Sequence, residues 1–231
     1  MRDQIYYSKF KAALESKQDS SRAIRMKAYM KGQFEFYGVS SPDRKGIVSG
    51  ILGEMGNPDL DVLWGITGLM WADPHREMQY SCMDITNRSL KILDKSMTPY
   101  YNKLIGQKSW WDSVDWLAPR VMGTLFQKYP GLQNEYLDHW INSGNKWYVR
   151  SAILFQLHYK EKTDFDLMCS LIIKSAGTKE FFINKASGWA LRQYSKLQPE
   201  LVIKFIDDHP ELHNLTKREG LKWMKNKGII E

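Results

Sequence analysis

The stretch Lys108-Ser109-Trp110-Trp111-Asp112-Ser113-Val114-Asp115-Trp116 is the part of the chain from which the fold can be worked out. It holds three of the nine tryptophans and two carboxylates three residues apart. Ser and Asp oxygens accept hydrogen bonds from the unpaired amides of a first helical turn, so the stretch predicts a helix start with Asp112 as a capping residue. Indoles beside a fixed negative charge either pack against the protein or hold a cation.

Trp111 has two counterparts farther along the chain. Arg150 follows it by 39 residues, and Trp189 follows Arg150 by another 39. Two helices per roughly 40 residues is the repeat of HEAT and armadillo proteins. We therefore expect these three residues to occupy equivalent positions of successive repeats and to be neighbours on one face.

The rest of the chain supports this repeat architecture. Apolar residues recur at helical spacing in segments separated by short turns, without the two-residue period of a strand. The sequence predicts an all-α protein, a single HEAT-like α-α superhelix over residues 1–231 with a concave groove. Residues 1–20 are expected to form an N-terminal helix of uncertain match to the repeats.

Several local features can be predicted as well. Ile5, Phe10 and Leu14 are expected to face the core from the first helix, and Ser20-Ser21 to cap the second. Pro42 suits the first turn of the next helix. Glycines recur along that helix at a spacing that predicts close helix–helix contact rather than a phosphate-binding loop. These glycines are Gly46, Gly50 and Gly53.

The composition is that of a globular protein that spans no membrane. Hydrophobic residues make up 43% and charged residues 26% of the 231 positions, and no run approaches the ~18 apolar residues of a membrane span. Met1-Arg2-Asp3-Gln4 carries no apolar stretch, so no secretory signal is expected. Cys82 and Cys169 lack metal-ligand spacing and predict free thiols in a reducing, cytoplasmic compartment.

The net charge of +7 is unevenly distributed. Residues 1–57 carry +4, residues 58–145 carry −2 and residues 146–231 carry +5. Two basic ends around a mildly acidic middle suit a polyanion held on both sides of a central site. A solvated Lys-rich surface is the alternative interpretation.

The candidate site consists of Trp111, Asp115, Arg150 and Trp189, with Tyr29 as a further member. Arginine binds phosphate through charged hydrogen bonds, and indole faces attract cations. Each residue also has a structural interpretation: Asp115 as a carboxylate near a helix N-terminus, the indoles as inter-repeat packing and Arg150 as an ion-pair partner. No Ser–His–Asp arrangement, metal-spaced cluster or phosphate loop accompanies them.

One reaction fits a lone carboxylate, indoles and an arginine: cleavage of an N-glycosidic bond through an oxocarbenium-like sugar. A neutral purine leaves poorly without a general acid, and none is evident. A purine alkylated at N3 or N7 is already cationic and leaves as a neutral base. A carboxylate ~4 Å from the sugar contributes roughly 4 kcal/mol at an effective dielectric of ~20, or about a thousandfold in rate.

The chain also resembles the AlkD-like DNA alkylation repair glycosylases, which are HEAT-like solenoids. The motifs that carry the resemblance lie in order between residues 22 and 227. They are Lys27–Phe34 with Tyr37-Gly38, Ser109–Asp115, Arg150–Leu157, and Lys179–Ala186 with Gly188–Arg192.

This resemblance implies a monofunctional glycosylase that removes N3- and N7-alkylpurines, such as 3-methyladenine and 7-methylguanine, from duplex DNA in a basic groove. It implies base excision repair without a base-flipping pocket. Asp115 would stabilise the sugar cation and position water, with Trp111 and Trp189 against the lesioned nucleotide. We expect DNA contacts from a further group of residues, with Arg150 binding phosphate. This group is Tyr29, Arg150, Lys185, Arg192 and Arg218.

The resemblance also favours a cytoplasmic, nucleoid-associated monomer that uses no cofactor or metal and binds no membrane. A non-catalytic HEAT-repeat protein that binds distorted or branched DNA is the alternative. A protein-interaction scaffold is a third interpretation, but it leaves the basic ends and the clustered indoles without a purpose.

Overall fold

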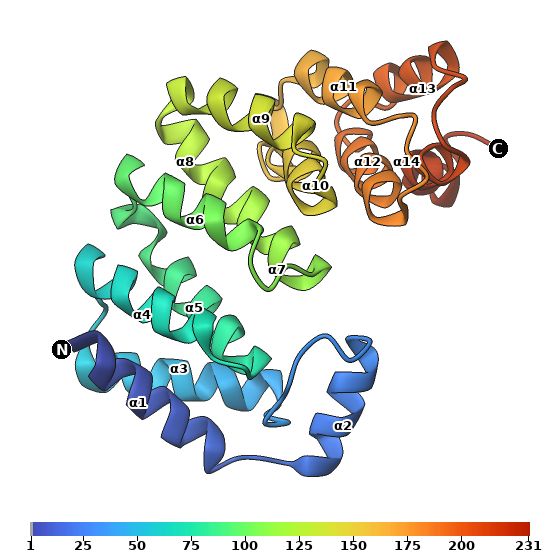
Figure 1. The fold of residues 1–231 in the computed structure, drawn as a ribbon. Coiled ribbons are helices and arrows are strands. Elements are labelled where there is room, and N and C mark those ends of the chain that lie inside the picture. The colour runs from blue at the N-terminus through green and yellow to red at the C-terminus, as the bar shows by residue number, and fades with distance from the viewer. Residues whose placement is uncertain (1) are drawn as a thin grey trace. The chain divides into compact units, whose positions relative to one another are not determined.

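The computed structural model describes residues 2–231, and its regular structure is helical (Figure 1). Within these residues the only β-type pairing is an isolated parallel bridge between Glu35 and His75. The predicted class, an all-α protein of paired helices as in an α-α superhelix, is confirmed. The chain divides into two compact units, one ending at Met97 and the other beginning at Thr98. The single domain expected over residues 1–231 stays a prediction.

The first unit is built from five α-helices. They are α1 (Arg2–Glu15), α2 (Ser20–Tyr29), α3 (Ser41–Met55), α4 (Leu60–Ala72) and α5 (Arg76–Ser89), followed by the 3-10 turns η1 (Leu90–Ile92) and η2 (Lys95–Met97). Helix α1 packs against α3 and α4 through Tyr6, Phe10 and Leu14, which are fully buried. Ile5 was expected in this core and is instead exposed, because the four-residue spacing of the inner face selects Tyr6.

Helix starts in this unit differ in one detail from expectation. Asp19, not Ser20-Ser21, caps α2, because the Asp19 side chain accepts a hydrogen bond from the backbone N–H of Arg22 at 2.9 Å. Pro42 lies in the first turn of α3, as predicted.

The glycine stripe of α3 makes no helix–helix contact, so that prediction is wrong. Val48, Ile51 and Leu52 face the core of the unit. The glycines therefore lie on the outer face, where a Cβ atom on any of them would meet open space. They are Gly46, Gly50 and Gly53.

A buried carboxylate fixes the segment between α2 and α3. Glu77 is fully buried, and its oxygens accept hydrogen bonds from the backbone N–H groups of Tyr37 (3.1 Å), Gly38 (2.8 Å) and Val39 (3.1 Å). Gly38 adopts a φ of +86°, and a Cβ there would lie 2.0 Å from the carbonyl oxygen of Asp19. The segment therefore depends on both a buried acid and a glycine.

The second unit contains the remaining helices. They are α6 (Thr98–Ile105), α7 (Trp111–Trp116), the π-helical turn η3 (Leu117–Met122), α8 (Gly123–Lys128), the 3-10 turn η4 (Pro130–Leu132), α9 (Gln133–Asn142), α10 (Lys146–Leu154), the 3-10 turn η5 (Lys160–Lys162), α11 (Phe165–Lys174), α12 (Phe181–Tyr194), α13 (Pro199–Asp208) and α14 (Asn214–Asn226). Helices α10, α12 and α14 pack in succession, and α12 and α14 lie side by side (Figure 1). Apolar residues of α10 to α14 form one continuous core.

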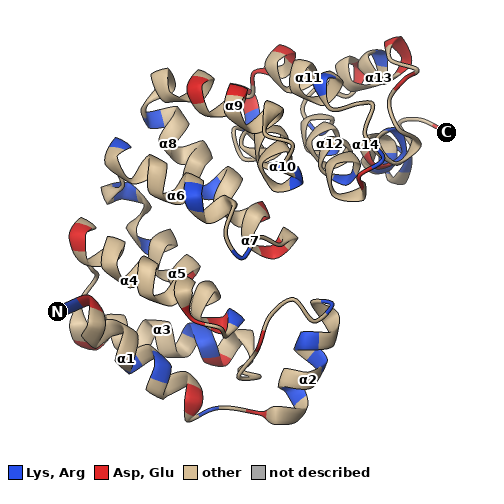
Figure 2. Ribbon diagram, in the orientation of Figure 1, with Lys and Arg blue, Asp and Glu red and all other residues tan. Residues whose placement is uncertain are grey.

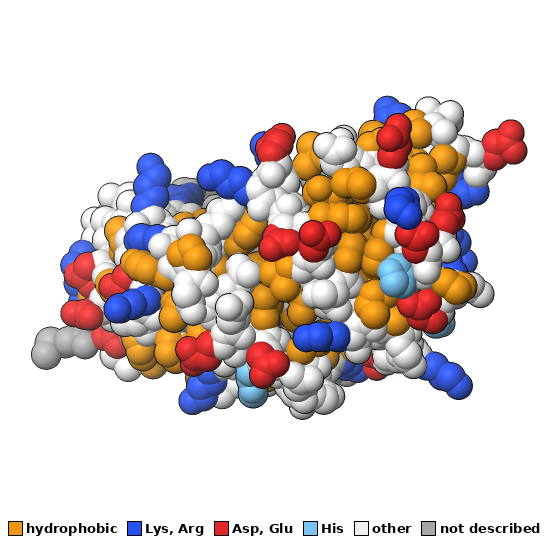
Figure 3. Space-filling model, turned by 90° about the horizontal axis from the view of Figure 1, so that it is seen from above, with side chains coloured by type: hydrophobic (Ala, Val, Ile, Leu, Met, Phe, Trp, Pro, Cys, Tyr) orange, Lys and Arg blue, Asp and Glu red, His pale blue; other side chains and the backbone are white. Residues whose placement is uncertain are grey.

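Basic residues are concentrated on particular helices. Figure 2 shows Lys and Arg along α2 and α14. Helix α2 buries none of its residues, and the apolar Ile24 is exposed beside its cations. On the face seen in Figure 3, acidic, basic and hydrophobic side chains are interspersed. Across residues 2–231, none of the helices combines the length and apolar character that a bilayer span needs.

Candidate active site

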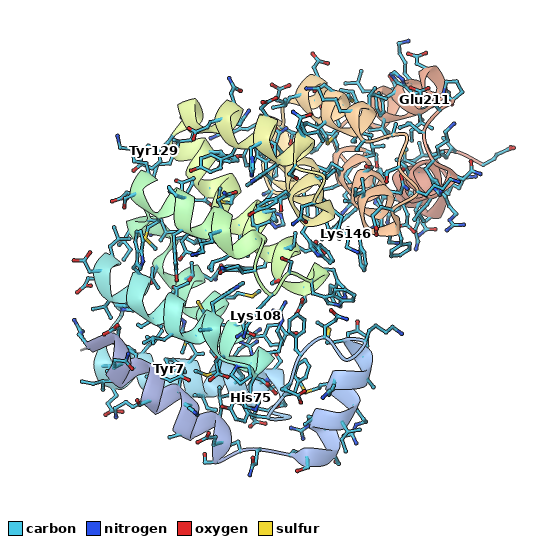
Figure 4. All side chains as sticks on the ribbon, viewed as in Figure 1. Tyr7, His75, Lys108, Tyr129, Lys146 and Glu211 are labelled. Atoms are coloured by element: carbon cyan, nitrogen blue, oxygen red, sulfur yellow. The ribbon has the colours of Figure 1, made fainter. Side chains whose placement is uncertain are left out.

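Helix α7, which carries the central tryptophans, starts without a side-chain cap. Trp110 occupies the N-cap position in an extended conformation, and Ser109 Oγ donates to the carbonyl of Ile105. Asp112 lies inside the first turn, where its charge favours the helix dipole, so its predicted capping role is wrong. Lys108, labelled in Figure 4, precedes this start with a φ of +48°, a strained conformation for a residue with a Cβ.

Trp110 anchors α7 to the neighbouring helices. Its ring centroid lies 5.6 Å from that of Trp147 on α10 and 5.4 Å from that of Phe182 on α12. Lys146, the first residue of α10 (Figure 4), places its Nζ 5.5 Å from the ring centroids of both Trp147 and Phe182. This aromatic cluster ties together the three helices that carry the candidate site.

Asp115 lies in the last turn of α7, where the helix changes character. Pro119 has no N–H to donate to the carbonyl of Asp115 four residues before it, so regular α-helical bonding is interrupted. The chain continues as a π-helical turn, which closes when the N–H of Gly123 donates to the carbonyl of Ala118. Pro119 is the feature of the sequence that marks this interruption.

Asp115 and Arg150 form an ion pair. Arg150 Nε donates to Asp115 Oδ1 at 2.6 Å, and Arg150 Nη2 donates to Oδ2 at 2.8 Å. Arg150 Nη1 donates to the carbonyl of Phe182. The Arg150 side chain is only 4% exposed and that of Asp115 16% exposed. Each nitrogen of the guanidinium thus donates to a protein group, and the carboxylate keeps contact with solvent.

The environment of Asp115 acts on its pKa in two directions. Burial raises the pKa of Asp115 above its usual value, and the charge of Asp112 adds to this. The hydrogen bonds and the charge of Arg150 oppose the shift by favouring the ionised form. A carboxylate oxygen offers two lone pairs, so each Asp115 oxygen can still accept a hydrogen bond from water or attract a nearby cation.

The ion pair faces a cavity of about 390 Å³. It is lined by Trp111, Asp115, Arg150, Phe181, Phe182, Lys185, Trp189 and Arg192. Trp111, Arg150 and Trp189 are therefore neighbours, as the 39-residue spacing predicted, because each comes from one of three successively packed helices. Among the described residues that line the cavity, Asp115 is the only carboxylate.

Cavity size alone does not identify this place. A larger cavity of about 720 Å³ lies between α11 and α13 and includes Asp166, Asp208 and His209. Its acids are not held by an arginine, and Asp208 pairs with the exposed Lys204. The smaller cavity is the better candidate because it combines a buried ion pair, half-buried indoles and further cations.

Two of those cations, Lys185 and Arg192, share one partner. Lys185 Nζ lies 2.7 Å from Glu219 Oε1, and Arg192 Nη1 lies 2.9 Å from Glu219 Oε2. Sequence reasoning named both cations but missed Glu219, because nothing in the local pattern of α14 marks one acid among many.

Sequence reasoning also missed Phe181 and Phe182. Phe182 is half-buried and supports Trp110 and Arg150, while Phe181 is 55% exposed at the cavity. Both lie within the motif Lys179–Ala186 that carries the family resemblance, so this motif could have identified them.

The remaining expected DNA contacts are not among the residues that line the cavity. Arg218 is an exposed residue of α14 beside Glu219 and does not line the cavity. Tyr29 is 69% exposed and belongs to the first unit. Their roles, like the phosphate-binding role of Arg150, stay predictions.

The chemistry available to this site is electrostatic. Within the described part of the chain, no group of three or more His, Cys, Asp or Glu side chains is placed to hold a metal ion. The cavity offers one carboxylate, two indoles and the cations Lys185 and Arg192. Such a site suits a ligand that is anionic on one side and cationic at its centre.

Comparison with known proteins agrees with this description. Residues 10–224 match the family model of the DNA alkylation repair enzymes. The fold is similar to the structure of a predicted DNA alkylation repair enzyme from Enterococcus faecalis, with a TM-score of 0.82 and 32% identity over 90% of this chain and 96% of that one. No curated protein matches the sequence significantly. The chain belongs to the DNA alkylation repair enzyme family.

Proposed function

We propose that this DNA alkylation repair protein is a monofunctional DNA glycosylase that releases cationic N3- and N7-alkylated purines from duplex DNA. The observation that carries the proposal is the Asp115 carboxylate, oriented by Arg150 and facing a cavity with Trp111 and Trp189. No cofactor, metal or base-flipping pocket is needed for this chemistry. We further propose that the protein acts as a monomer on the DNA of the nucleoid, in the cytoplasm.

In the proposed reaction the N-glycosidic bond breaks and its electron pair neutralises the departing alkylated base. Positive charge then develops on the sugar, where Asp115 stabilises it. At ~4 Å and an effective dielectric of ~20 this interaction is worth roughly 4 kcal/mol, about a thousandfold in rate. Water adds to C1′ and gives up a proton to Asp115 or to solvent.

The position of Arg150 refines its proposed role. Its side chain is 4% exposed and donates three hydrogen bonds to protein groups. We infer that it is a positioning residue for Asp115. Lys185 and Arg192, which line the same cavity and are more exposed, are better placed to bind phosphate.

The same ion pair also favours the second candidate, a non-catalytic protein that binds distorted DNA. Both oxygens of Asp115 already accept hydrogen bonds, which weakens the carboxylate as a base. The two candidates differ in one measurable outcome, release of the base.

The test is release of 7-methylguanine from methylated duplex DNA by the wild type and by Asp115→Asn. We expect the variant to retain duplex binding and to lose about a thousandfold in rate, because the amide cannot balance the sugar cation. Asp112→Asn is the matched control, since Asp112 lies on the same helix outside the cavity lining. Equal release by the wild type and Asp115→Asn contradicts the catalytic assignment, and binding without release supports the second candidate.

A further inference from the structure

Glu219 is a buried acid that pairs with two cations lining the cavity, Lys185 and Arg192. Its side chain is 6% exposed, and its two oxygens hold Lys185 and Arg192 at 2.7 and 2.9 Å. Lys185 and Arg192 are seven residues apart on α12 and therefore project from the same face of the helix. One carboxylate of α14 thus sets the positions of two cations on α12.

Gly188 allows α12 and α14 to come into close contact at this point. Gly188 lies between the two cations along α12, and a Cβ on it would come 2.5 Å from the Glu219 Cβ and 2.8 Å from the carbonyl oxygen of Thr216. Thr216 Oγ1 donates to the carbonyl of Asn184 at 3.1 Å, which fixes the two helices lengthwise. Glu219 therefore has little freedom to move away from its partners.

The charge balance around Glu219 keeps the carboxylate ionised. Burial acts to raise the pKa of Glu219, but the hydrogen bond from Lys185 and the charges of Lys185, Arg192 and Lys222 outweigh it and lower the pKa. The group of Lys185, Arg192 and Glu219 thus carries a net charge of +1, although it presents two cations to the cavity. Lys185 and Arg192 each keep N–H groups that Glu219 does not use.

We propose that Glu219 is a specificity-determining positioning residue for the phosphate groups of the substrate. It holds Lys185 and Arg192 where a phosphate beside the lesion would lie, and it cancels one of their charges. Without it the two cations would attract any duplex more strongly but would bind phosphate in less defined positions. This inference rests on the proposed function, because it concerns how DNA is held at the same cavity.

The decisive measurement is the salt dependence of binding to undamaged duplex DNA, for wild type and Glu219→Gln. We expect the slope of log K against log salt to steepen by about one unit, because the variant has one more net positive charge at the interface. We expect tighter binding at low salt, together with base release slower by on the order of tenfold at saturating DNA, because the phosphate is misplaced. A loss of structure alone would weaken binding and would not steepen the slope.

The fold of Glu219→Gln could be destabilised by the charges of Lys185 and Arg192, which this variant leaves without a carboxylate partner. Two further variants test the inference in that case. Lys185→Gln combined with Glu219→Gln restores the net charge, so its slope should return to that of the wild type while release stays slow. Glu219→Asp keeps the charge and should keep the wild-type slope. A slope for Glu219→Gln equal to or shallower than that of the wild type overturns the inference, as does a steepened slope in the double variant.

The outcome also separates this inference from the proposed function. If the wild type binds DNA and releases alkylated base but Glu219→Gln does not steepen the slope, only the role of Glu219 fails. If the wild type binds DNA without releasing base, the glycosylase proposal fails and the slope still decides the role of Glu219. A wild type that does not bind duplex DNA overturns both.

Discussion

Two acids of this protein, the buried Glu77 in the first unit and the half-buried Asp115 in the second, have opposite surroundings. Glu77 is fully buried and accepts hydrogen bonds from three backbone N–H groups of one loop. Asp115 accepts from one arginine side chain and keeps 16% of its own side chain exposed at a cavity. The first carboxylate organises backbone, and the second is itself held in place and remains accessible.

This difference separates a structural acid from a candidate catalytic one. A carboxylate that satisfies backbone amides cannot be removed without leaving those amides unpaired in the interior. A carboxylate oriented by a buried arginine and open on one side can interact with a charge that arrives with a ligand. The type of hydrogen-bond partner, together with exposure at a cavity, therefore distinguishes the two acids.

The largest effect that we expect is on stability, from Glu77→Ala. Three buried N–H groups would lose their acceptor, each at a cost of about 1–3 kcal/mol. The sum is comparable to the ~5–15 kcal/mol total stability of a typical domain. Urea unfolding followed by circular dichroism measures the loss.

The control for this variant is Glu54→Ala, in the same unit. Glu54 forms an exposed ion pair with Lys9 and should contribute at most about 1 kcal/mol. If Glu77→Ala is no more destabilising than Glu54→Ala, Glu77 does not organise the loop and the comparison with Asp115 loses its basis.

The next effect concerns the arginine that orients Asp115. Arg150→Lys keeps the charge but cannot reproduce the two-pronged contact, so base release should fall by about a hundredfold through misplacement of the carboxylate. Single-turnover release from methylated duplex DNA measures this.

Arg150→Gln removes the charge and tests whether Arg150 also binds phosphate. We expect Arg150→Gln combined with Asp115→Asn, which together leave the net charge at the cavity unchanged, to have the same salt slope of DNA binding as the wild type, because the buried Arg150 side chain donates to protein groups. Arg218→Gln is the control, since loss of an exposed phosphate contact should reduce the slope by about one unit. A similar reduction in this charge-balanced double variant would show that Arg150 binds phosphate directly, as the sequence predicted.

Much of this architecture could be predicted from sequence because helical periodicity and repeat length are local signals. The 39-residue spacing located Trp111, Arg150 and Trp189 on one face, since stacked helix pairs place equivalent residues side by side. The same kind of pattern failed for the α3 glycines, because spacing shows that residues share a face without showing whether that face is inside.

The interactions that shape the site were harder to predict because they depend on how helices pack. Glu219 meets Lys185 and Arg192 only because Gly188 lets α14 approach α12 closely. The contacts of Arg150 with Asp115 and the Phe182 carbonyl likewise require three helices at fixed distances. Residue types identified candidates, but the partner of each charge follows from tertiary packing.

The smallest effect that we expect is a pH dependence that distinguishes Asp115 from an ordinary surface acid. Burial raises the pKa of Asp115 above 3.8, and the proposed reaction needs the ionised form. As the pH falls from neutral, base release by the wild type should therefore decline through an apparent pKa above 3.8, after subtraction of spontaneous depurination. The residual activity of Asp115→Asn should lack this decline.

The sign of the shift also predicts that activity is lost before structure. A carboxyl group whose pKa is higher in the folded state contributes stability below its unfolded pKa, and this contribution is lost as the pH rises through the folded pKa. Protonation of Asp115 therefore does not favour unfolding, whereas its loss of charge removes the stabilisation of the sugar cation. Circular dichroism recorded alongside release should show a folded protein throughout the decline. A decline in release that coincides with unfolding would instead assign the pH dependence to the acids that stabilise the fold. The structural difference between Glu77 and Asp115 would then not correspond to a difference in function.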